Sequence, residues 1–170
     1  MKRLLILIVA VTLLTGCGYR LQTRGDLPFE SIAIGEIRNF TYEPRLKDRM
    51  LSILAEALTS YGFSIANDAR FRIEGEIKDF NMLVLSEKDL TASEYGIDIS
   101  VAFRVTDTVT GKTYSVTILK PFSTHSKVRE RFSEVLVQKD QQTKKALSDI
   151  AQEIVRYLLY DLAAHNAINQ

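Results

Sequence analysis

The chain has 170 residues with 22 basic and 21 acidic side chains, so its net charge is close to zero. This balance argues against a nucleic-acid partner, which a strongly basic chain would favour. The length fits one domain with a real apolar core, and no internal repeat or low-complexity tract suggests a second one. The single cysteine excludes an intramolecular disulfide.

The N-terminus has the pattern of an export signal. Lys2 and Arg3 precede an uninterrupted apolar run from Leu4 to Leu14, which are the charged and apolar regions of a signal peptide. The run is well short of the roughly 20 residues that a membrane-spanning helix needs. We therefore expect residues 1–16 to be removed on export.

Small residues lead directly to Cys17 in Leu14-Thr15-Gly16-Cys17, which resembles the site cut by the lipoprotein signal peptidase. We expect a diacylglycerol and an N-acyl chain such as palmitate on Cys17, with residues 17–30 as a tether; several acyl chains together anchor a protein firmly to a membrane. The alternative is an ordinary exported protein with a chance free cysteine. Without Lys2 and Arg3 the mature chain has 20 basic against 21 acidic residues, a net charge of −1.

The first half of the domain predicts a strand and then a helix. Residues 31–37 alternate between apolar and small or polar side chains, as in a short strand. From Leu46 to Tyr61 apolar residues recur at helical spacing. Pro44 suits the start of this helix and Gly62 its end.

Three further strands are predicted by alternation in residues 70–85, 95–105 and 114–118. In the first of these the parity changes near Lys78 and Asp79, which indicates a β-bulge. Residues 107–112 contain a turn signal between antiparallel neighbours. Residues 122–138 have no clean period, and we expect a connection with a possible extended piece.

A second amphipathic helix is expected from about Asp140, a candidate N-cap, for roughly 24 residues. The order β-α-β-β-β-α predicts an α+β two-layer sandwich, with two helices on one face of a four-stranded mixed sheet and the other face polar or open to a partner. Residues 31–164 would form this domain, and residues 165–170 a C-terminal tail.

The sequence offers little for catalysis. It contains none of the common hydrolase, zinc-protease or phosphate-loop motifs. His125 and His165 are far apart and lack a neighbouring cysteine or carboxylate cluster, which makes a metal site improbable. We therefore expect no enzyme, no metal and no cofactor apart from the covalent lipid.

Several short segments stand in a characteristic order along the mature chain. They are Cys17-Gly18-Tyr19-Arg20-Leu21, Leu27-Pro28, Ile32-Ala33-Ile34, Asn39-Phe40-Thr41-Tyr42-Glu43-Pro44-Arg45-Leu46, Ala69 to Ile77 and Glu94-Tyr95. Together they resemble the LptE family of lipopolysaccharide-assembly lipoproteins, over essentially the whole mature chain. The resemblance implies the same β-α-β-β-β-α order that periodicity indicates.

The resemblance implies a non-enzymatic partner of LptD, the outer-membrane β-barrel that delivers lipopolysaccharide to the cell surface. Proteins of this family plug the barrel, help it to assemble and bind lipopolysaccharide. In enteric bacteria an Asp directly after the lipidated cysteine resembles a signal for retention in the inner membrane, and this chain has Gly18 at that position. We therefore expect a location in the cell outer membrane, lipid-anchored, on the periplasmic side and in the barrel lumen.

Lipopolysaccharide carries phosphates and acidic sugars, which lysine and arginine bind through charge-assisted hydrogen bonds. The resemblance implies two such positions: Lys88, expected in a turn at residues 86–93, and Lys139, expected at the start of the second helix. Each could instead be an ordinary solvated lysine. The basic group Lys127, Arg129 and Arg131 is a weaker candidate because acidic residues are interleaved with it.

Three alternatives belong to other classes. One is a non-enzymatic lipoprotein that binds peptidoglycan or another envelope assembly. A second is an envelope hydrolase with an unfamiliar site, for which the sequence offers no cluster of carboxylates. A third is a soluble lipid carrier, which needs an apolar cavity that two helices packed on a sheet would not leave.

Overall fold

The computed structural model describes residues 27–88, 91–116, 122–127 and 132–168. The expected signal peptide, Cys17, Arg129 and Arg131 lie outside these residues. The elements in chain order are β1 (Ser31–Asn39), α2 (Leu46–Ser60), β2 (Ser64–Ile65), β3 (Phe71–Lys88), β4 (Thr91–Asp107), β5 (Thr113–Val116), β6 (Phe122–Lys127) and α3 (Phe132–Ile168).

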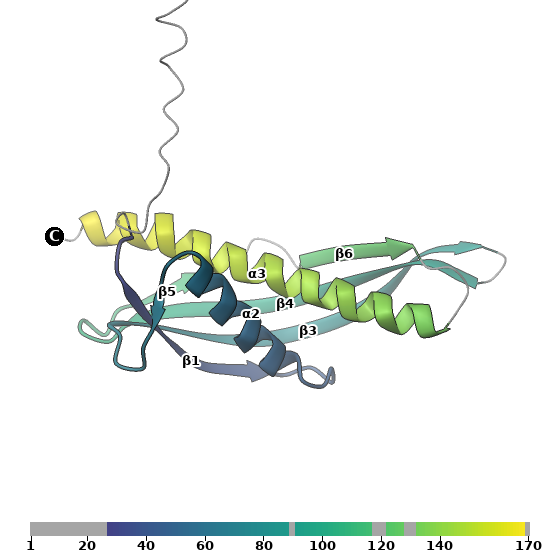
Figure 1. Cartoon of the computed structure of the whole chain (residues 1–170), viewed down its shortest axis with the longest axis horizontal. Coiled ribbons are helices and arrows are strands. Elements are labelled where there is room, and N and C mark those ends of the chain that lie inside the picture. Colours follow the sequence, from purple (N-terminus) through teal and green to yellow (C-terminus); the bar gives the residue numbers. More distant parts are fainter. Residues whose placement is uncertain (1–26, 89–90, 117–121, 128–131, 169–170) are drawn as a thin grey trace, which may run out of the picture.

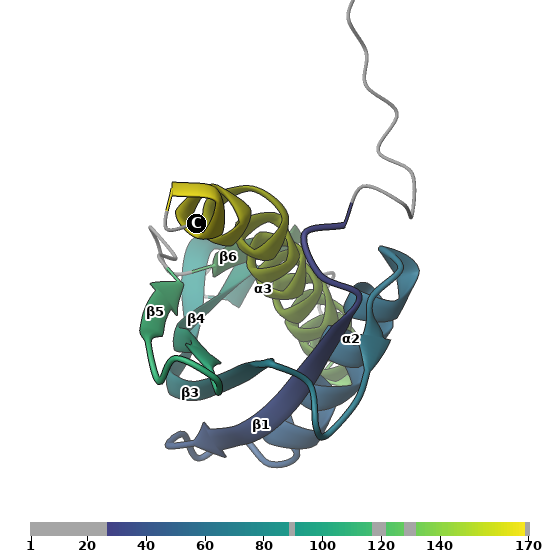
Figure 2. The ribbon, with the colours of Figure 1, turned by 90° about the vertical axis from the view of Figure 1, so that its left-hand side faces the viewer.

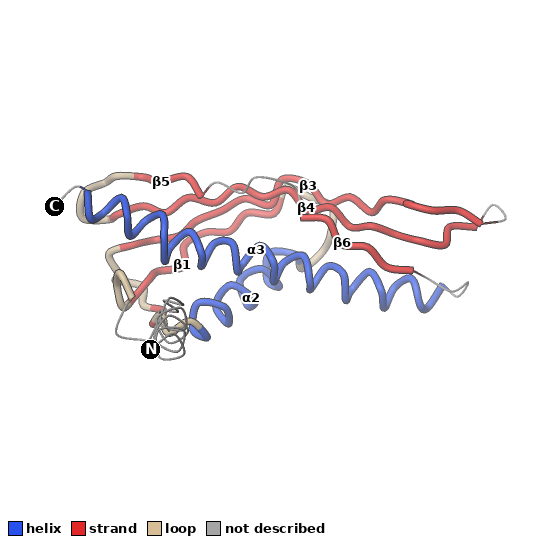
Figure 3. Tube along the Cα trace, turned by 90° about the horizontal axis from the view of Figure 1, so that it is seen from above, coloured by secondary structure: helices blue, strands red, loops and turns tan. Residues whose placement is uncertain are grey.

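The fold is a two-layer α+β sandwich, as the sequence predicts. The sheet has the order β2-β1-β3-β4-β5, and β6 pairs with β4. β1 runs parallel to β2 and β3 and the remaining pairs are antiparallel, so the sheet is mixed. Both helices lie on the same side of the sheet, which is clearest in Figure 3 and in the end-on view of Figure 2.

The strand count of four was wrong, because the described residues form a sheet of six strands. β2 has only two residues, which is too short for alternation to reveal. β6 is the extended piece that the sequence left open within residues 122–138, and it pairs with residues 94–99 in the first half of β4. Ile118, expected in the strand after the turn, lies outside the described residues.

The change of parity in β3 is a β-bulge, as predicted. Ile77 pairs with Val101, but the next pair joins Asp79 to Ser100, so Lys78 is the extra residue. Ile77 is fully buried before the bulge, and Phe80 packs against the same core after it. The bulge therefore returns the apolar side chains of β3 to the helix side of the sheet.

The first helix lies where the sequence places it. Met50, Leu54 and Leu58 follow the helical period and are fully buried. Gly62 ends the helix with a φ of 101°, a conformation that glycine adopts without steric cost. The helix start is less usual, because Arg45 has a φ of 60° without being a glycine.

The second helix is longer than expected. α3 begins at Phe132 and has 37 residues, so Asp140 lies inside the helix and the prediction of an N-cap there was wrong. The helix also continues to Ile168, through the first residues of the expected tail. At a rise of 1.5 Å per residue it is about 55 Å long, and it lies along the long axis of an elongated molecule (Figure 1).

The core lies between the helices and the sheet, and it is built mainly of aliphatic side chains from β1, α2, β3, β4 and α3. The opposite side of β1, β3 and β4 has ion pairs, Arg38 with Glu76 and Arg104 with Glu74. We call the side of the sheet that carries these four residues the outer sheet face. Its polar character agrees with the expectation for the uncovered side of the sheet.

Candidate functional site

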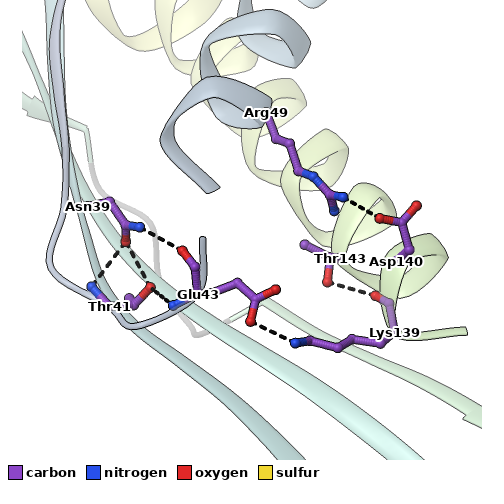
Figure 4. Close-up of polar contacts among 7 residues, drawn as sticks. All are labelled: Asn39, Thr41, Glu43, Arg49, Lys139, Asp140 and Thr143. Carbon is purple, nitrogen blue, oxygen red and sulfur yellow. Dashed lines mark hydrogen bonds and ion pairs between the residues drawn. The ribbon is translucent and has the colours of Figure 1, made fainter. Parts of the chain in front are cut away.

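A polar network joins the end of β1 to α3 (Figure 4), although the two segments are about a hundred residues apart in the sequence. Its first part is the loop of residues 40–45, which we call the 40–45 loop. The Asn39 Oδ1 atom accepts hydrogen bonds from the backbone N–H of Thr41 at 3.0 Å and from its hydroxyl at 2.8 Å. Asn39 also donates to the backbone oxygen of Glu43 at 2.9 Å.

A further bond closes the loop, because the backbone N–H of Glu43 donates to the hydroxyl of Thr41 at 3.2 Å. Short Asn and Thr side chains form such local bonds readily and hold a turn in one conformation. The 40–45 loop is therefore fixed by its own side chains, and the position of the Glu43 backbone is determined.

Lys139 of α3 meets this loop. Its Nζ atom lies 2.7 Å from Oε2 of Glu43 and 5.4 Å from the centroid of the Phe80 ring. The side chains are 29% exposed for Lys139 and 20% exposed for Glu43, so water reaches the pair only in part. An ion pair and a cation–π contact together hold the ammonium group in place.

A second ion pair lies beside the first and joins the two helices. Arg49 of α2 contacts Asp140 of α3, the residue that follows Lys139 (Figure 4). Thr143, one turn later, donates its hydroxyl to the backbone oxygen of Lys139 at 2.7 Å. In this cluster two cations face two anions, so the cluster as a whole has no net charge.

This geometry corrects the expected position of Lys139. The residue is not at the start of a helix, because seven helical residues precede it. Nor is it an ordinary solvated lysine, because Glu43 and Phe80 contact its ammonium group. An acidic ligand at Lys139 would have to share the ammonium group with Glu43 or displace the carboxylate.

Lys88 lies elsewhere. It is the last residue of β3, paired with Thr91 of β4, so the turn expected at residues 86–93 is shorter and residues 86–88 and 91–93 belong to strands. Lys127 is the last residue of β6 and pairs with Glu94, which itself pairs with Ser86. The backbones of Lys88 and Lys127 therefore lie at the same end of the sheet.

The structure does not bring Lys88 and Lys139 together. The ammonium group of Lys139 lies over Phe80, which is eight residues before Lys88 in β3. At about 3.3 Å per residue this separation is roughly 25 Å. The two lysines cannot bind one phosphate group, and if both bind lipopolysaccharide they contact different parts of it.

One ion pair with a buried carboxylate and a half-exposed arginine was not anticipated from the sequence. Asp107, at the end of β4, is 1% exposed and accepts two hydrogen bonds from Arg70, at 3.1 and 2.7 Å. It also accepts from the backbone N–H groups of Val109 and Thr110. The Arg70 hydrogen bond, followed by the turn N–H groups, holds the pKa of Asp107 well below its usual range. This group fixes the β4–β5 turn.

Sequence reasoning also gave no role to two exposed aromatic residues. Phe40 is 61% exposed and Tyr42 is fully exposed, and both belong to the 40–45 loop. Periodicity cannot identify such residues, because they lie between the predicted elements. The signal that could have found them is the aromatic character of a loop sequence, Asn-Phe-Thr-Tyr, that contains turn-forming residues.

Within the described residues no group of His, Cys, Asp and Glu is arranged to hold a metal ion. The same part of the chain contains no helix that is long and apolar enough to cross a bilayer.

The family model LptE, described as lipopolysaccharide-assembly, matches residues 29–162 of the chain. The match begins just before β1 and ends in the last part of α3, so it includes every strand that the structure describes, α2 and most of α3. No curated protein matches the sequence of this chain.

Solved structures of similar fold include lipoproteins from three bacteria. An uncharacterized lipoprotein B from Nitrosomonas europaea has a TM-score of 0.58 at 16% identity and covers 86% of this chain and 94% of its own. Rare lipoprotein B from Shewanella oneidensis has a TM-score of 0.55 at 11% identity, with 81% and 96% covered. A minor lipoprotein from Acinetobacter baumannii has a TM-score of 0.51 at 18% identity, with 82% and 97% covered. These likenesses support the fold.

Proposed function

Because the chain belongs to the LptE family of lipopolysaccharide-assembly proteins, we propose that it is an outer-membrane lipoprotein that forms a complex with the LptD β-barrel. In that complex it acts as plug and assembly partner and binds lipopolysaccharide for delivery to the cell surface. The observation that carries this proposal is the family match over residues 29–162, which spans the described strands, α2 and most of α3. The match gives no support to the alternative of a peptidoglycan-binding lipoprotein.

The shape and surface of the domain are consistent with a plug. The molecule is elongated (Figure 1), and its outer sheet face carries the ion pairs Arg38–Glu76 and Arg104–Glu74. The interior of an outer-membrane barrel is polar and wet. A body with this surface can be accommodated in such a lumen without burying unpaired charges.

The anchor and the absence of catalysis also belong to the proposal. Cleavage before Cys17 and acylation of its thiol would attach the domain to the periplasmic side of the outer membrane. Binding lipopolysaccharide and supporting a barrel require recognition but no bond-breaking step, so we infer that the chain is not an enzyme and needs no cofactor.

For lipopolysaccharide we propose two separate contacts, at Lys139 and at Lys88. Lys139 is held by Glu43 at 2.7 Å, and a phosphate that approaches its partly exposed ammonium group would compete with this carboxylate. Replacing Lys139 with Gln removes the cation without placing a second carboxylate beside Glu43. We expect Lys88→Gln and Lys139→Gln each to weaken lipopolysaccharide binding, and the double variant to weaken it further.

The test of the overall proposal is purification of the tagged full-length chain from detergent-solubilised outer membrane. We expect a large β-barrel to copurify in about equal amount. The matched control is Cys17→Ser, which removes the acylated thiol and leaves the domain unchanged. Recovery of murein fragments in place of a barrel, or recovery of the wild-type chain alone, would contradict the proposal.

A further inference from the structure

The 40–45 loop presents two large aromatic side chains to solvent. Phe40 is 61% exposed and Tyr42 is fully exposed. Exposed aromatic residues next to each other on a loop are costly to leave in water, and they are the residue types that contribute most to protein–protein interfaces. This pair therefore calls for an explanation other than the stability of the domain, because neither ring is buried in the core.

The loop is held by contacts within the domain itself. Its backbone is held by Asn39 and Thr41, and its Glu43 side chain is tied to Lys139 of α3 at 2.7 Å (Figure 4). A loop that already has its bound conformation loses little conformational entropy on association, which favours affinity. The network that fixes Lys139 thus also fixes the position from which the two aromatic residues project.

The loop continues directly from the outer sheet face. The guanidinium carbon of Arg38 lies 5.6 Å from the centroid of the Phe40 ring, and the same guanidinium pairs with Glu76. Phe40 is therefore joined to the row of ion pairs on the uncovered side of the sheet. The combination is a polar surface with two exposed aromatic side chains at its edge, and aromatic residues are enriched in protein interfaces relative to the rest of a protein surface.

The charges around the loop favour a protein over a lipid surface. The ion pairs of Arg38, Arg49 and Lys139 each bring an acidic partner to the nearby surface. A surface that docks on acidic lipid headgroups needs an excess of positive charge. Here three cations near the loop are matched by anions, which leaves the exposed Arg45 as the cation of the loop itself. A polar protein surface with apolar recesses for the rings of Phe40 and Tyr42 therefore fits better than a lipid surface.

We propose that the 40–45 loop and the adjoining outer sheet face form the surface that docks against the inner wall of the barrel partner, with Phe40 and Tyr42 as anchors. This inference rests on the proposed function, which supplies the barrel, and it adds which side of the domain meets the wall. The helix side, with α2 and α3, then faces away from that contact.

The experiment compares two variants of the tagged full-length chain in the pull-down from solubilised outer membrane. The first is Phe40→Ser with Tyr42→Ser. The control is Tyr61→Ser, which removes an aromatic side chain that is 51% exposed at the opposite end of α2. We expect the double variant to lower the recovered barrel by about tenfold or more, as for hot-spot residues, and the control to leave it unchanged.

Thermal unfolding of both purified variants should match the wild type, since the removed rings are exposed, and this separates lost docking from lost folding. Equal recovery of barrel with wild type and double variant would overturn the inference while the proposed function stands. Retained barrel with reduced binding to vesicles that contain lipopolysaccharide would also overturn it, because the loop would then contact lipid. If the wild-type chain recovers no barrel, the proposed function fails first.

Discussion

The contact between Lys139 and Glu43 yields a prediction that separates structure from ligand binding. We consider Lys139→Glu, the change that most directly reverses the charge of the candidate lipopolysaccharide contact. The variant would place a carboxylate beside Glu43, where the structure has an ammonium group at 2.7 Å. Loss of lipopolysaccharide binding in this variant would therefore have two causes, the missing cation and a disturbed 40–45 loop.

The expected change in the free energy of unfolding follows from the exposure of the two side chains. Exposed ion pairs contribute about 0–1 kcal/mol, and removal of one partner from a fully buried pair costs about 3–5 kcal/mol. At 29% and 20% exposure the Lys139–Glu43 pair lies between these limits. We expect Lys139→Gln to lower the free energy of unfolding by about 1 kcal/mol and Lys139→Glu by about 2 kcal/mol, because like charges then repel.

Urea unfolding of the soluble domain without the signal peptide measures both values. The double variant Lys139→Glu with Glu43→Lys restores opposite charges with the two side chains exchanged, and we expect it to recover most of the lost stability. Lys144→Glu, at an exposed position of the same helix, is the control for a simple change in net charge. If the exchange recovers nothing, or if Lys144→Glu destabilises the domain as much, the ion pair does not hold the loop.

Three further predictions concern other parts of the chain. The folded-state pKa of Asp107 lies below its ordinary value of 3.8, so the stability from its bonds to Arg70 is present above about pH 4 and lost as the pH falls further. Asp107→Asn should lower the urea midpoint at pH 7 and make the stability depend less on pH in the acid range. An unchanged dependence on acid pH would contradict this assignment. Gly75→Ala should lower the free energy of unfolding by about 1–3 kcal/mol, because the new Cβ would lie 2.3 Å from two ring carbons of Phe103. In a double-mutant cycle of urea unfolding, Gly75→Ala should lower the free energy of unfolding less when Phe103→Leu is also present. Cys17→Ser should abolish fatty-acid labelling and leave unprocessed precursor on a gel, whereas a processed, unlabelled wild-type chain would argue for an ordinary signal peptide.

Where one side of an element is buried, the sequence predicts it well. The helix at Leu46–Ser60 and the bulge at Lys78 both follow from the spacing of apolar residues, because burial on one side imposes a period that the sequence must keep. The start of α3 was missed because burial imposes no such period there. Leu136 and Val137 are both more than half exposed, and none of residues 135–140 is buried.

The contacts of the candidate site could be predicted only in part. Local hydrogen-bonding residues such as Asn39 and Thr41 mark a turn from the sequence alone. The pairing of Glu43 with Lys139 could not be foreseen, since nothing in either segment specifies a contact across 96 positions. The sequence therefore identified Lys139 as a candidate by resemblance but could not indicate that its ammonium group already has an anionic neighbour.

The length of β3 determines how far the β3–β4 tip lies from the tether end of the domain. From Phe71, which pairs with the start of β1, to Lys88 the strand covers about 55 Å at 3.3 Å per residue. The nine residues between Cys17 and Leu27 give ten Cα–Cα steps, which can span at most about 35 Å when fully extended. Because residue 27 and the β3–β4 tip lie at opposite ends of the domain, Lys88 is farther from the anchor than Lys139, and a plug that enters the barrel tip first would carry Lys88 into the lumen ahead of Lys139.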